Sequence, residues 1–252
     1  MIPDISGPIS LDGKIAIVTG ASRGIGKAIA LALIREGAYV GAFDVLPCES
    51  IRDLPAAKEK VIAATCDVTN ELEIKNAVES VVSQWGRVDI LVNNAAIVGI
   101  YGKELEDFTI EEWEELIKTN LESTFLMTRE VWPYMKQVGK GKVICIGSIA
   151  GKIGGFFAGP HYCASKSGIH GFVKWAAKNG AKYGIHVNGI APGPTVTKMT
   201  ADEPLITDNM VPLGRLGQPE DIAEVVIFLS SQASNFITGC VLDVNGGLLM
   251  TQ

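Results

Sequence analysis

The sequence predicts an α/β fold over residues 1–252: one domain built on a doubly wound, seven-stranded parallel sheet with helices on both faces. Two observations lead to this fold class. Short apolar runs alternate with helical patterns along the chain, as expected when helices connect neighbouring parallel strands. The first apolar run also passes directly into a glycine-rich turn that opens a helix. We see no linker, repeat or low-complexity tract in the sequence, so we expect a single domain.

Seven apolar runs are expected to form the strands, at residues 14–19, 39–44, 61–66, 89–93, 142–146, 185–190 and 240–244. Helical periodicity predicts connecting helices at residues 27–35, 71–85, 109–137, 161–182 and 219–229. Acidic residues open the helix over 109–137, where they suit the positive end of its dipole. Two segments outside this alternation are expected to wall a substrate pocket: residues 149–157, with Phe156 and Phe157, and a cap over residues 194–213.

The composition limits the possible partners. The chain is 47% hydrophobic, which excludes general disorder, and its net charge of −6 argues against nucleic acid or an anionic membrane as a partner. No apolar run reaches the roughly 18 residues of a membrane span, and the first residues lack the features of a secretory signal. We therefore expect a cytoplasmic protein. Five cysteines without C-x-x-C spacing and three unclustered histidines predict free thiols and no metal site.

The turn after the first strand has the features of a phosphate-binding loop. Gly20 permits a tight turn, Gly24 allows backbone N–H groups to approach a pyrophosphate, and Gly26 lets the helix pack closely on the strand. A glycine triplet alone could be ordinary turn chemistry, but the strand before it and the helix after it favour dinucleotide binding. The other residues of this turn expected to contact the cofactor are Ser22, Arg23 and Ile25.

Asp44 ends the second strand and is the residue that bears on cofactor choice. Its carboxylate can accept hydrogen bonds from the adenosine ribose hydroxyls and would repel the additional phosphate of NADP. The next residue, Val45, is not basic, although Arg23 could soften the preference. The sequence therefore predicts NAD as cofactor, with NADP less favoured. The alternative interpretation is that Asp44 is a solvated turn residue.

Two further strand ends are expected to reach the cofactor. Asp67 and Val68 follow the third strand, where a contact with adenine is expected. Asn93, Asn94 and Ala95 follow the fourth strand. Their two amides could brace the sheet or line the cofactor, and we expect Asn94 and Ala95 to do the latter.

Tyr162 and Lys166 stand four residues apart in the predicted helix 161–182, and therefore one turn apart on one face. A lysine ammonium favours the phenolate over the phenol, so this tyrosine could give a proton to a carbonyl oxygen or take one from an alcohol. Ser148, at the end of the fifth strand, could donate a hydrogen bond to the same oxygen. Tyr and Lys also occur at this spacing on surface helices by chance, so the pair alone is a weak signal.

Asn120 lies within the predicted helix 109–137, near what the apolar pattern indicates is the buried side. A buried amide requires hydrogen-bond partners. Asn120 is therefore either a brace within the core or part of a polar site.

Together, and in this order, these motifs resemble the short-chain dehydrogenase/reductase family in its compact one-domain branch. The matching residues span nearly the whole chain: 19–26 (TGASRGIG), 93–95, Asn120, Ser148, Tyr162, Lys166, Pro192, Gly193 and Thr197. Within the family, the chain is most similar to the 3-oxoacyl-(acyl carrier protein) reductase-like and polyol dehydrogenase groups. One departure is Ala96, where the family usually has glycine.

The resemblance implies a Rossmann-type dinucleotide fold and a role for each matching residue. Tyr162 would be the proton donor or acceptor, Ser148 would orient the substrate oxygen, and Lys166 would bind the nicotinamide ribose. Asn120 would hold a water in a proton relay to Lys166, and Thr197 would touch the nicotinamide carboxamide. The remaining implied cofactor contacts are Pro192, Gly193 and Thr195. The resemblance also points to a homotetramer of two-fold symmetry.

These observations predict an NAD-dependent oxidoreductase that interconverts a secondary alcohol (a polyol, sugar or small hydroxy compound) and the corresponding ketone. The alternative is an NADPH-dependent 3-oxoacyl-thioester reductase. That activity would favour a basic surface for an acidic carrier protein, whereas the candidate lysines are scattered: Lys136, Lys140, Lys142 and Lys178. A remote alternative is a non-catalytic regulatory protein that binds a dinucleotide. The expected partner is a small-molecule substrate.

Overall fold

The computed structural model of the chain describes residues 9–57, 59–99, 102–155, 158–201 and 206–250. Its strands are β1 (Ile15–Thr19), β2 (Tyr39–Asp44), β3 (Val61–Thr65), β4 (Ile90–Asn93), β5 (Gly141–Ile146), β6 (Ile185–Pro192) and β7 (Val241–Val244). Its helices are α1 (Gly24–Arg35), α2 (Glu49–Arg52), α3 (Glu71–Trp85), α4 (Ile110–Ile117), α5 (Ser123–Val138), α6 (Ala150–Ile153), α7 (Pro160–Gly180) and α8 (Pro219–Ser230).

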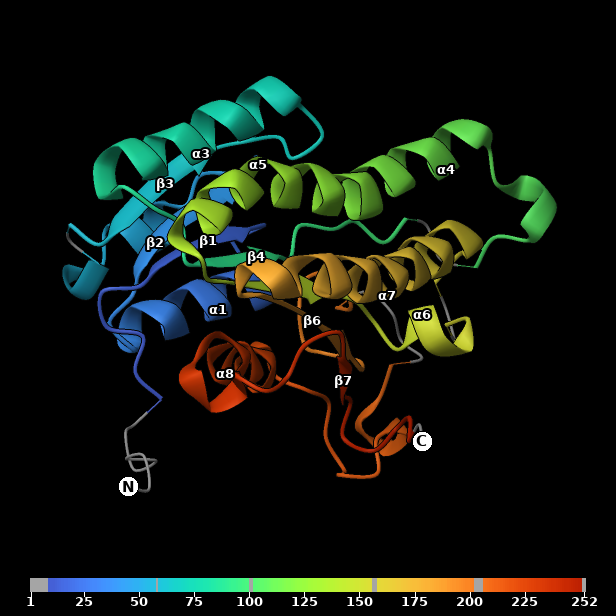
Figure 1. Cartoon of the computed structure of the whole chain (residues 1–252). Coiled ribbons are helices and arrows are strands. Elements are labelled where there is room, and N and C mark those ends of the chain that lie inside the picture. The colour runs from blue at the N-terminus through green and yellow to red at the C-terminus, as the bar shows by residue number, and fades with distance from the viewer. Residues whose placement is uncertain (1–8, 58, 100–101, 156–157, 202–205, 251–252) are drawn as a thin grey trace.

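The seven strands form one parallel sheet in the order β3-β2-β1-β4-β5-β6-β7. The helices α3, α4, α5 and α7 cover one face, and α1 and α8 cover the other (Figure 1). The predicted fold class is therefore confirmed: a single-domain, doubly wound α/β fold. Because the strand order reverses beside β1, the loops that follow β1 and β4 leave the sheet in opposite directions and open a crevice at its carboxyl edge.

Each face of the sheet has its own apolar core. On one side, α1 and α8 pack over the strands with fully buried residues such as Ile29, Leu33 and Val226. On the other side, Val78 of α3 and Val131 of α5 are fully buried over the opposite face of the strands. Since both faces are covered, the central strands are buried on both sides, and their sequences are continuous apolar runs rather than alternating ones.

The largest local difference from the predicted elements lies between residues 109 and 138. A π-helical segment, Lys118–Glu122, joins α4 to α5, so the expected single helix is interrupted by a wider turn with Asn120 at its centre. A capping box of Thr109 and Glu112 opens α4, in agreement with the predicted acidic start. Pro133 lies inside α5, which continues to Val138.

Three other elements differ in extent from their predictions. The first helix begins at Gly24 rather than at residue 27, and residues 150–153, expected in a loop, form the single turn α6. In the cap, Asp208–Met210 form a short 3₁₀ turn. Phe156 and Phe157, predicted to wall the substrate pocket, lie outside the described residues, as do residues 202–205 of the cap.

None of the helices in the described part of the chain is long and apolar enough to cross a membrane. The five cysteines have free thiols, of which Cys48, Cys66 and Cys145 are buried. Within the same residues, no group of three or more His, Cys, Asp or Glu side chains is arranged to hold a metal ion.

Candidate active site

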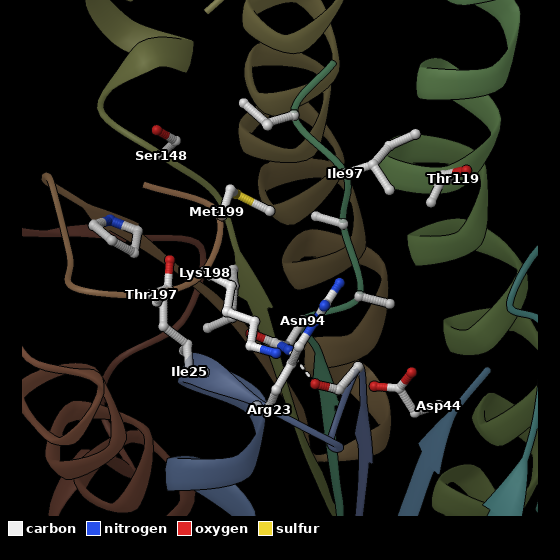
Figure 2. Close-up of a pocket in the computed structure, with 18 of the residues that line it drawn as sticks. Arg23, Ile25, Asp44, Asn94, Ile97, Thr119, Ser148, Thr197, Lys198 and Met199 are labelled. Atoms are coloured by element: carbon white, nitrogen blue, oxygen red, sulfur yellow. Dashed lines mark hydrogen bonds between the residues drawn. The ribbon is translucent and has the colours of Figure 1, made fainter. Parts of the chain in front are cut away.

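A cavity of about 490 Å³ lies at the carboxyl edge of the sheet and is lined by residues that follow β1 to β6. Most predicted cofactor and catalytic residues line it: Gly20, Arg23, Gly24, Ile25, Gly26, Asp44, Asp67, Val68, Asn94, Ala95, Ser148, Tyr162, Lys166, Pro192, Gly193, Thr195 and Thr197. The two that do not are Ser22 and Asn120. The fold therefore brings residues from the whole chain to one concave site, part of which is visible in Figure 2.

The glycine loop is held against the end of β4 by hydrogen bonds to Asn94. The Asn94 Nδ2 donates to the carbonyl oxygens of Thr19 (2.9 Å) and Gly20 (3.2 Å), while the Thr19 hydroxyl accepts the N–H of Asn94 (3.0 Å). Gly26 allows this close approach, since a Cβ there would lie 2.0 Å from the Gly20 carbonyl oxygen. Asn93 instead braces the sheet by donating to the Thr128 hydroxyl (3.0 Å). The two amides thus fill the two predicted roles separately.

The glycine loop fits the phosphates of a dinucleotide. The loop opens α1, whose first backbone N–H groups have no helical partner and face an anion favourably. The Ser22 hydroxyl, in the loop itself, is buried, has no hydrogen-bond partner among the described residues and does not line the cavity. The backbone of the loop and the start of α1 would therefore hold the pyrophosphate of the cofactor.

Asp44 is fixed in place by backbone hydrogen bonds. Its Oδ2 accepts the N–H of Ser22 at 3.0 Å, and its Oδ1 accepts the N–H of Leu46 at 2.9 Å. The carboxylate therefore lines the cavity in a defined orientation, and its bond to Leu46 also closes the turn after β2. Asp67 lies at the next strand end, where its Oδ1 accepts the N–H of Thr69 at 2.8 Å.

Two cations extend into the same cavity. Arg23 comes from the glycine loop, and Lys198 comes from the segment after β6 (Figure 2). Neither forms an ion pair within the described part of the chain. The Lys198 segment lies close to the loop: a Cβ on Gly24 would be 3.4 Å from the Thr197 methyl group. From the sequence, only Arg23 was expected here, so the positive charge available to an anionic ligand is larger than expected.

Tyr162 and Lys166 lie one turn apart on α7, as predicted, and both line the cavity. The Lys166 ammonium is 5.6 Å from the centre of the Tyr162 ring and donates a hydrogen bond to the Ile146 carbonyl oxygen at 3.0 Å. Lys166 is only 2% exposed. Burial disfavours its charged form and lowers the pKa of Lys166 to about 8. The lysine can therefore change its charge near physiological pH.

Ser148 follows β5 and lines the same cavity (Figure 2). Its Oγ accepts the N–H of Ala150 at 3.1 Å. Because this bond uses a lone pair of the oxygen, the hydroxyl hydrogen remains available to donate to a substrate oxygen.

Asn120 is fully buried, and its amide is occupied by hydrogen bonds. The Oδ1 accepts the N–H of Ile97 (2.8 Å), while Nδ2 donates to the Ile97 carbonyl (2.9 Å) and the Ser165 hydroxyl (3.3 Å). The side chain thus braces the segment after β4, at Ile97, against α7 at Ser165, which is the residue before Lys166. Of the two roles left open by the sequence, this geometry corresponds to the brace. The water relay implied by the family resemblance stays a prediction.

Several lining residues at or near strand ends were not among the predicted contacts, because nothing in the sequence distinguishes them from ordinary strand ends: Val45, Leu46, Cys66, Ala96, Ile97, Val98, Ile146 and Gly147. Thr119, from the π-helical segment, was missed because its placement depends on how that segment folds over the sheet. Lys198, Met199 and Thr200 belong to the cap over residues 194–213, which was predicted to wall the pocket, but they were not predicted individually.

A dinucleotide loop and a Ser-Tyr-Lys set in one cavity define the class of this protein as an oxidoreductase with a nucleotide cofactor. Residues 20–249 match the family described as enoyl-(acyl carrier protein) reductase. The solved structure of a short-chain type dehydrogenase/reductase from Mycobacterium marinum is 30% identical, with a TM-score of 0.90 over 96% of this chain and 98% of that one. The chain belongs to the short-chain dehydrogenase/reductase family.

Its similarity to named relatives extends over nearly the full length. The 3-oxoacyl-[acyl-carrier-protein] reductase FabG of Thermotoga maritima is 39% identical, covering 95% of this chain and 99% of the relative. The protein of the same name from Escherichia coli K12 is 40% identical, covering 96% and 100%. The solved structure of gox2181 is 34% identical, with a TM-score of 0.86 over 95% of this chain and 97% of that one.

Proposed function

We propose that this protein reduces a 3-oxoacyl thioester to the 3-hydroxyacyl thioester, or catalyses the reverse reaction. The observation that carries the proposal is the convergence of Ser148, Tyr162 and Lys166 on the cavity formed by the dinucleotide loop. The names of the relatives support the acyl substrate. These names favour the alternative predicted from the sequence, a 3-oxoacyl-thioester reductase, over the first prediction, an enzyme that acts on a polyol, sugar or small hydroxy compound.

The residues of the chain would handle the proton and the orientation of the substrate. A bound nicotinamide supplies or accepts the hydride at the carbon atom. Tyr162 gives its phenolic proton to the carbonyl oxygen in the reduction and takes it back in the oxidation. Ser148 donates a hydrogen bond to the same oxygen, and the Lys166 cation stabilises the phenolate that Tyr162 becomes.

We propose NAD as the cofactor, on the basis of Asp44. Hydrogen bonds between its carboxylate and the ribose hydroxyls are worth roughly 1.5–3 kcal/mol when one partner is charged. The 2′-phosphate of NADP would lose these bonds and meet a like charge. The second candidate is NADP, which Arg23 and Lys198 favour because both add positive charge to the cavity.

Cofactor choice is tested by comparing kcat/KM for NADH and NADPH. We expect a preference for NADH of at least about tenfold, the factor that 1.4 kcal/mol delivers. Asp44→Ala combined with Val45→Arg should reduce or invert the preference for NADH. Lys198→Met, with Asp44 and Val45 unchanged, should increase it. Equal efficiency with the two cofactors in the wild-type protein would show that the cations prevail over Asp44.

A second substrate class is a small, free secondary alcohol or ketone. The observation that favours it is the acidic surface of α4, the helix that packs beside α7. Four of its eight residues are acidic: Glu111, Glu112, Glu114 and Glu115. Among the described residues, Glu112 is paired with Lys103, and the other three form no ion pair. An acidic carrier protein approaching this helix would meet like charge.

One panel of substrates separates these possibilities. It contains acetoacetyl-CoA, acetoacetyl-N-acetylcysteamine, an acetoacetyl carrier protein, sorbitol and 2-butanone or 2-butanol, each with both cofactors. The proposal requires higher kcat/KM for the 3-oxoacyl thioesters than for the polyol and the simple ketone. Turnover of the polyol or ketone alone would contradict it. Comparison of the carrier protein with the short thioester measures the effect of the acidic helix directly.

A further inference from the structure

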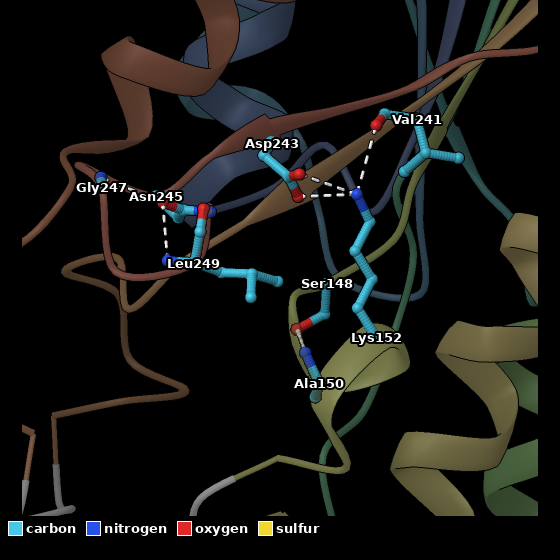
Figure 3. Close-up of polar contacts among 8 residues, drawn as sticks. All are labelled: Ser148, Ala150, Lys152, Val241, Asp243, Asn245, Gly247 and Leu249. Carbon is cyan, nitrogen blue, oxygen red and sulfur yellow. Dashed lines mark hydrogen bonds and ion pairs between the residues drawn. The ribbon is translucent and has the colours of Figure 1, made fainter. Parts of the chain in front are cut away.

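Lys152 on α6 forms a shielded ion pair with Asp243 on β7. The Lys152 ammonium lies 2.8 Å from the Asp243 carboxylate and donates a second, longer hydrogen bond to the Val241 carbonyl at 3.4 Å (Figure 3). Each side chain is 20% exposed, and no other ion pair in the described part of the chain shields both partners as well. An ion pair removed from water contributes little net stability, because desolvation offsets its attraction. Its effect is to fix the relative position of the two elements.

The element fixed at the lysine end is the turn that carries Ser148. Helix α6 has only four residues and cannot maintain its position alone. It begins at Ala150, two residues after Ser148, and the Ser148 Oγ accepts the Ala150 N–H, so the hydroxyl moves with the helix. A backbone contact supports it from one side: a Cβ on Gly151 would lie 2.7 Å from the Lys166 carbonyl carbon on α7.

The turn is also backed by a buried imidazole. His170 on α7 is 8% exposed, and its Nε2, which has no hydrogen-bond partner, would lie 2.4 Å from a Cβ on Gly147. Burial lowers the pKa of His170 to about 4, so the ring is neutral at physiological pH and does not compete with Lys152 for the carboxylate. The chain at Gly147 therefore packs against His170, and the helix that follows Ser148 is held by Lys152.

The aspartate end is fixed as well. Asp243 pairs in register with Ala191 of β6. Two residues later, the Asn245 side chain closes the following turn: its Oδ1 accepts the N–H of Gly247 (3.0 Å) and of Leu249 (3.2 Å), and its Nδ2 donates to the Leu249 carbonyl (3.0 Å) (Figure 3). Asp243 thus lies on a strand anchored on both sides of it.

We infer that the Lys152–Asp243 ion pair positions Ser148 for the reaction. Lys152 and Asp243 are positioning residues, since neither lines the cavity. This inference rests on the proposed role of Ser148 in carbonyl chemistry. Without the ion pair, α6 can shift and Ser148 with it. The glycine loop and Lys166, which are held by other contacts, would keep the cofactor in place.

The test compares Lys152→Met, Asp243→Asn and Lys152→Arg with the wild type, using acetoacetyl-CoA or whichever carbonyl of the panel is turned over fastest. Lys152→Met and Asp243→Asn should lower kcat about tenfold, while the Kd for NADH from fluorescence titration stays within about twofold. Lys152→Arg, which retains the charge, should preserve most of kcat. The matched control is Arg87→Met, which breaks the ion pair with Asp89 (2.9 Å) at the opposite edge of the sheet. It should lower thermal stability and leave kcat unchanged.

Two measurements separate positioning from general destabilisation. In a Ser148→Ala background, Lys152→Met should cause no further loss of kcat, because residues that act through one another are not additive. An equal loss in both backgrounds would overturn the inference, as would a folded Lys152→Met protein with wild-type kcat. Amide hydrogen exchange at Ala150 should be faster in Lys152→Met than in Arg87→Met. Unchanged exchange at Ala150 would overturn the inference. This measurement does not depend on turnover, whereas a failure to turn over any carbonyl substrate would refute the proposed function.

Discussion

Lys166 combines two properties that rarely occur together, deep burial and a full set of donors aimed at a cavity. Its ammonium uses one hydrogen bond to the Ile146 carbonyl, which leaves further N–H groups for a ligand. Burial lowers its pKa to about 8. A buried charge is unfavourable, and a lysine with a strongly lowered pKa in a cavity often has a functional role. The Tyr162 ring beside it indicates that this role is to stabilise the phenolate.

The Tyr162→Phe substitution tests the proton transfer. It removes only the phenolic hydroxyl, so we expect turnover to fall by at least about 100-fold, the lower range for loss of a positioned acid or base. Fluorescence titration should give an NADH affinity close to that of the wild type. Tyr183→Phe, at a half-buried tyrosine beside Lys136 and Lys182 and away from the cavity, is the control and should retain activity. Turnover of Tyr162→Phe within tenfold of the wild type would refute the assignment.

The pH dependence of the reduction should report the Lys166 charge. The ammonium is present below about pH 8 and is lost as the pH rises through that value. Since the cation stabilises the phenolate formed when Tyr162 gives up its proton, kcat/KM for reduction should fall above about pH 8. Lys166→Arg stays charged to much higher pH and should remove this inflection.

Lys142 provides the control for the pH profile. Burial lowers its pKa to about 8 as well, but it lies at the start of β5, at the opposite end of the strand from the site. Lys142→Met should leave the inflection of the wild type in place. If the inflection disappears in Lys142→Met and persists in Lys166→Arg, it reports the charge of Lys142, and its assignment to Lys166 is wrong.

Among the elements, the strand–loop–helix unit of β1 and α1 depends most strictly on one residue. Gly26→Ala would place a Cβ 2.0 Å from the Gly20 carbonyl oxygen and 2.5 Å from Asn94 Nδ2. We expect a loss of about 1–3 kcal/mol in the free energy of unfolding, as for other overpacking changes, together with weakened NADH binding. Gly171→Ala on α7 is the control because its Cβ would meet nothing within 4 Å. It should be stabilising by about 0.5–1 kcal/mol. Denaturant unfolding and NADH titration measure both effects.

The segment 110–138 shows how far helical periodicity can be trusted. The apolar pattern placed Asn120 near the buried side, and both Asn120 and Leu116 are buried. Trp113 and Phe125, from the same pattern, are 39% and 46% exposed. The π-helical turn between them adds a residue to the turn and rotates the faces on either side of it relative to each other. A pattern with one fixed period cannot describe both faces.

Helix α6 was missed for a related reason. Glycines at positions 151, 154 and 155 suggested a loop, yet Gly151 is required where the helix backbone meets the backbone of α7. By contrast, the central strands were predictable because burial on both faces makes each of them a continuous apolar run, whereas the edge strands β3 and β7 are only partly buried and were predicted from their apolar runs alone. Lys198 could not be placed from the sequence, since an exposed lysine in a cap has no pattern and reaches the cavity only through the fold of its segment.

At the scale of the whole molecule, we expect a homotetramer. Of the apolar residues on the outer helices that could mark an interface, Leu126, Val131 and Val173 belong to the core, whereas Trp175 is 64% exposed. Trp175 lies on α7 and Phe125 on α5, two helices that cover the same face of the sheet (Figure 1). Both side chains are exposed, and exposed apolar side chains of this kind can mark an interface. Light scattering should give four times the monomer mass, and Trp175→Glu should reduce it. Leu72→Glu, at a 66% exposed site on α3, is the control. A stable wild-type monomer at micromolar concentration would contradict this expectation.

The buried thiols also determine how the protein tolerates oxidants and alkylating reagents. The reactive form of cysteine is the thiolate, and burial raises the pKa of Cys66 and Cys145 to about 12 and that of Cys48 to about 11. The half-buried Cys163, beside Tyr162, and Cys240 have raised pKa values too. Iodoacetamide at neutral pH should therefore react slowly, first at Cys163 and Cys240. The Cys163 thiol faces the Gly154 and Ala158 carbonyl oxygens rather than the cavity, so its rate of labelling, followed by mass spectrometry, makes this residue a native reporter of how firmly the end of α6 packs on α7.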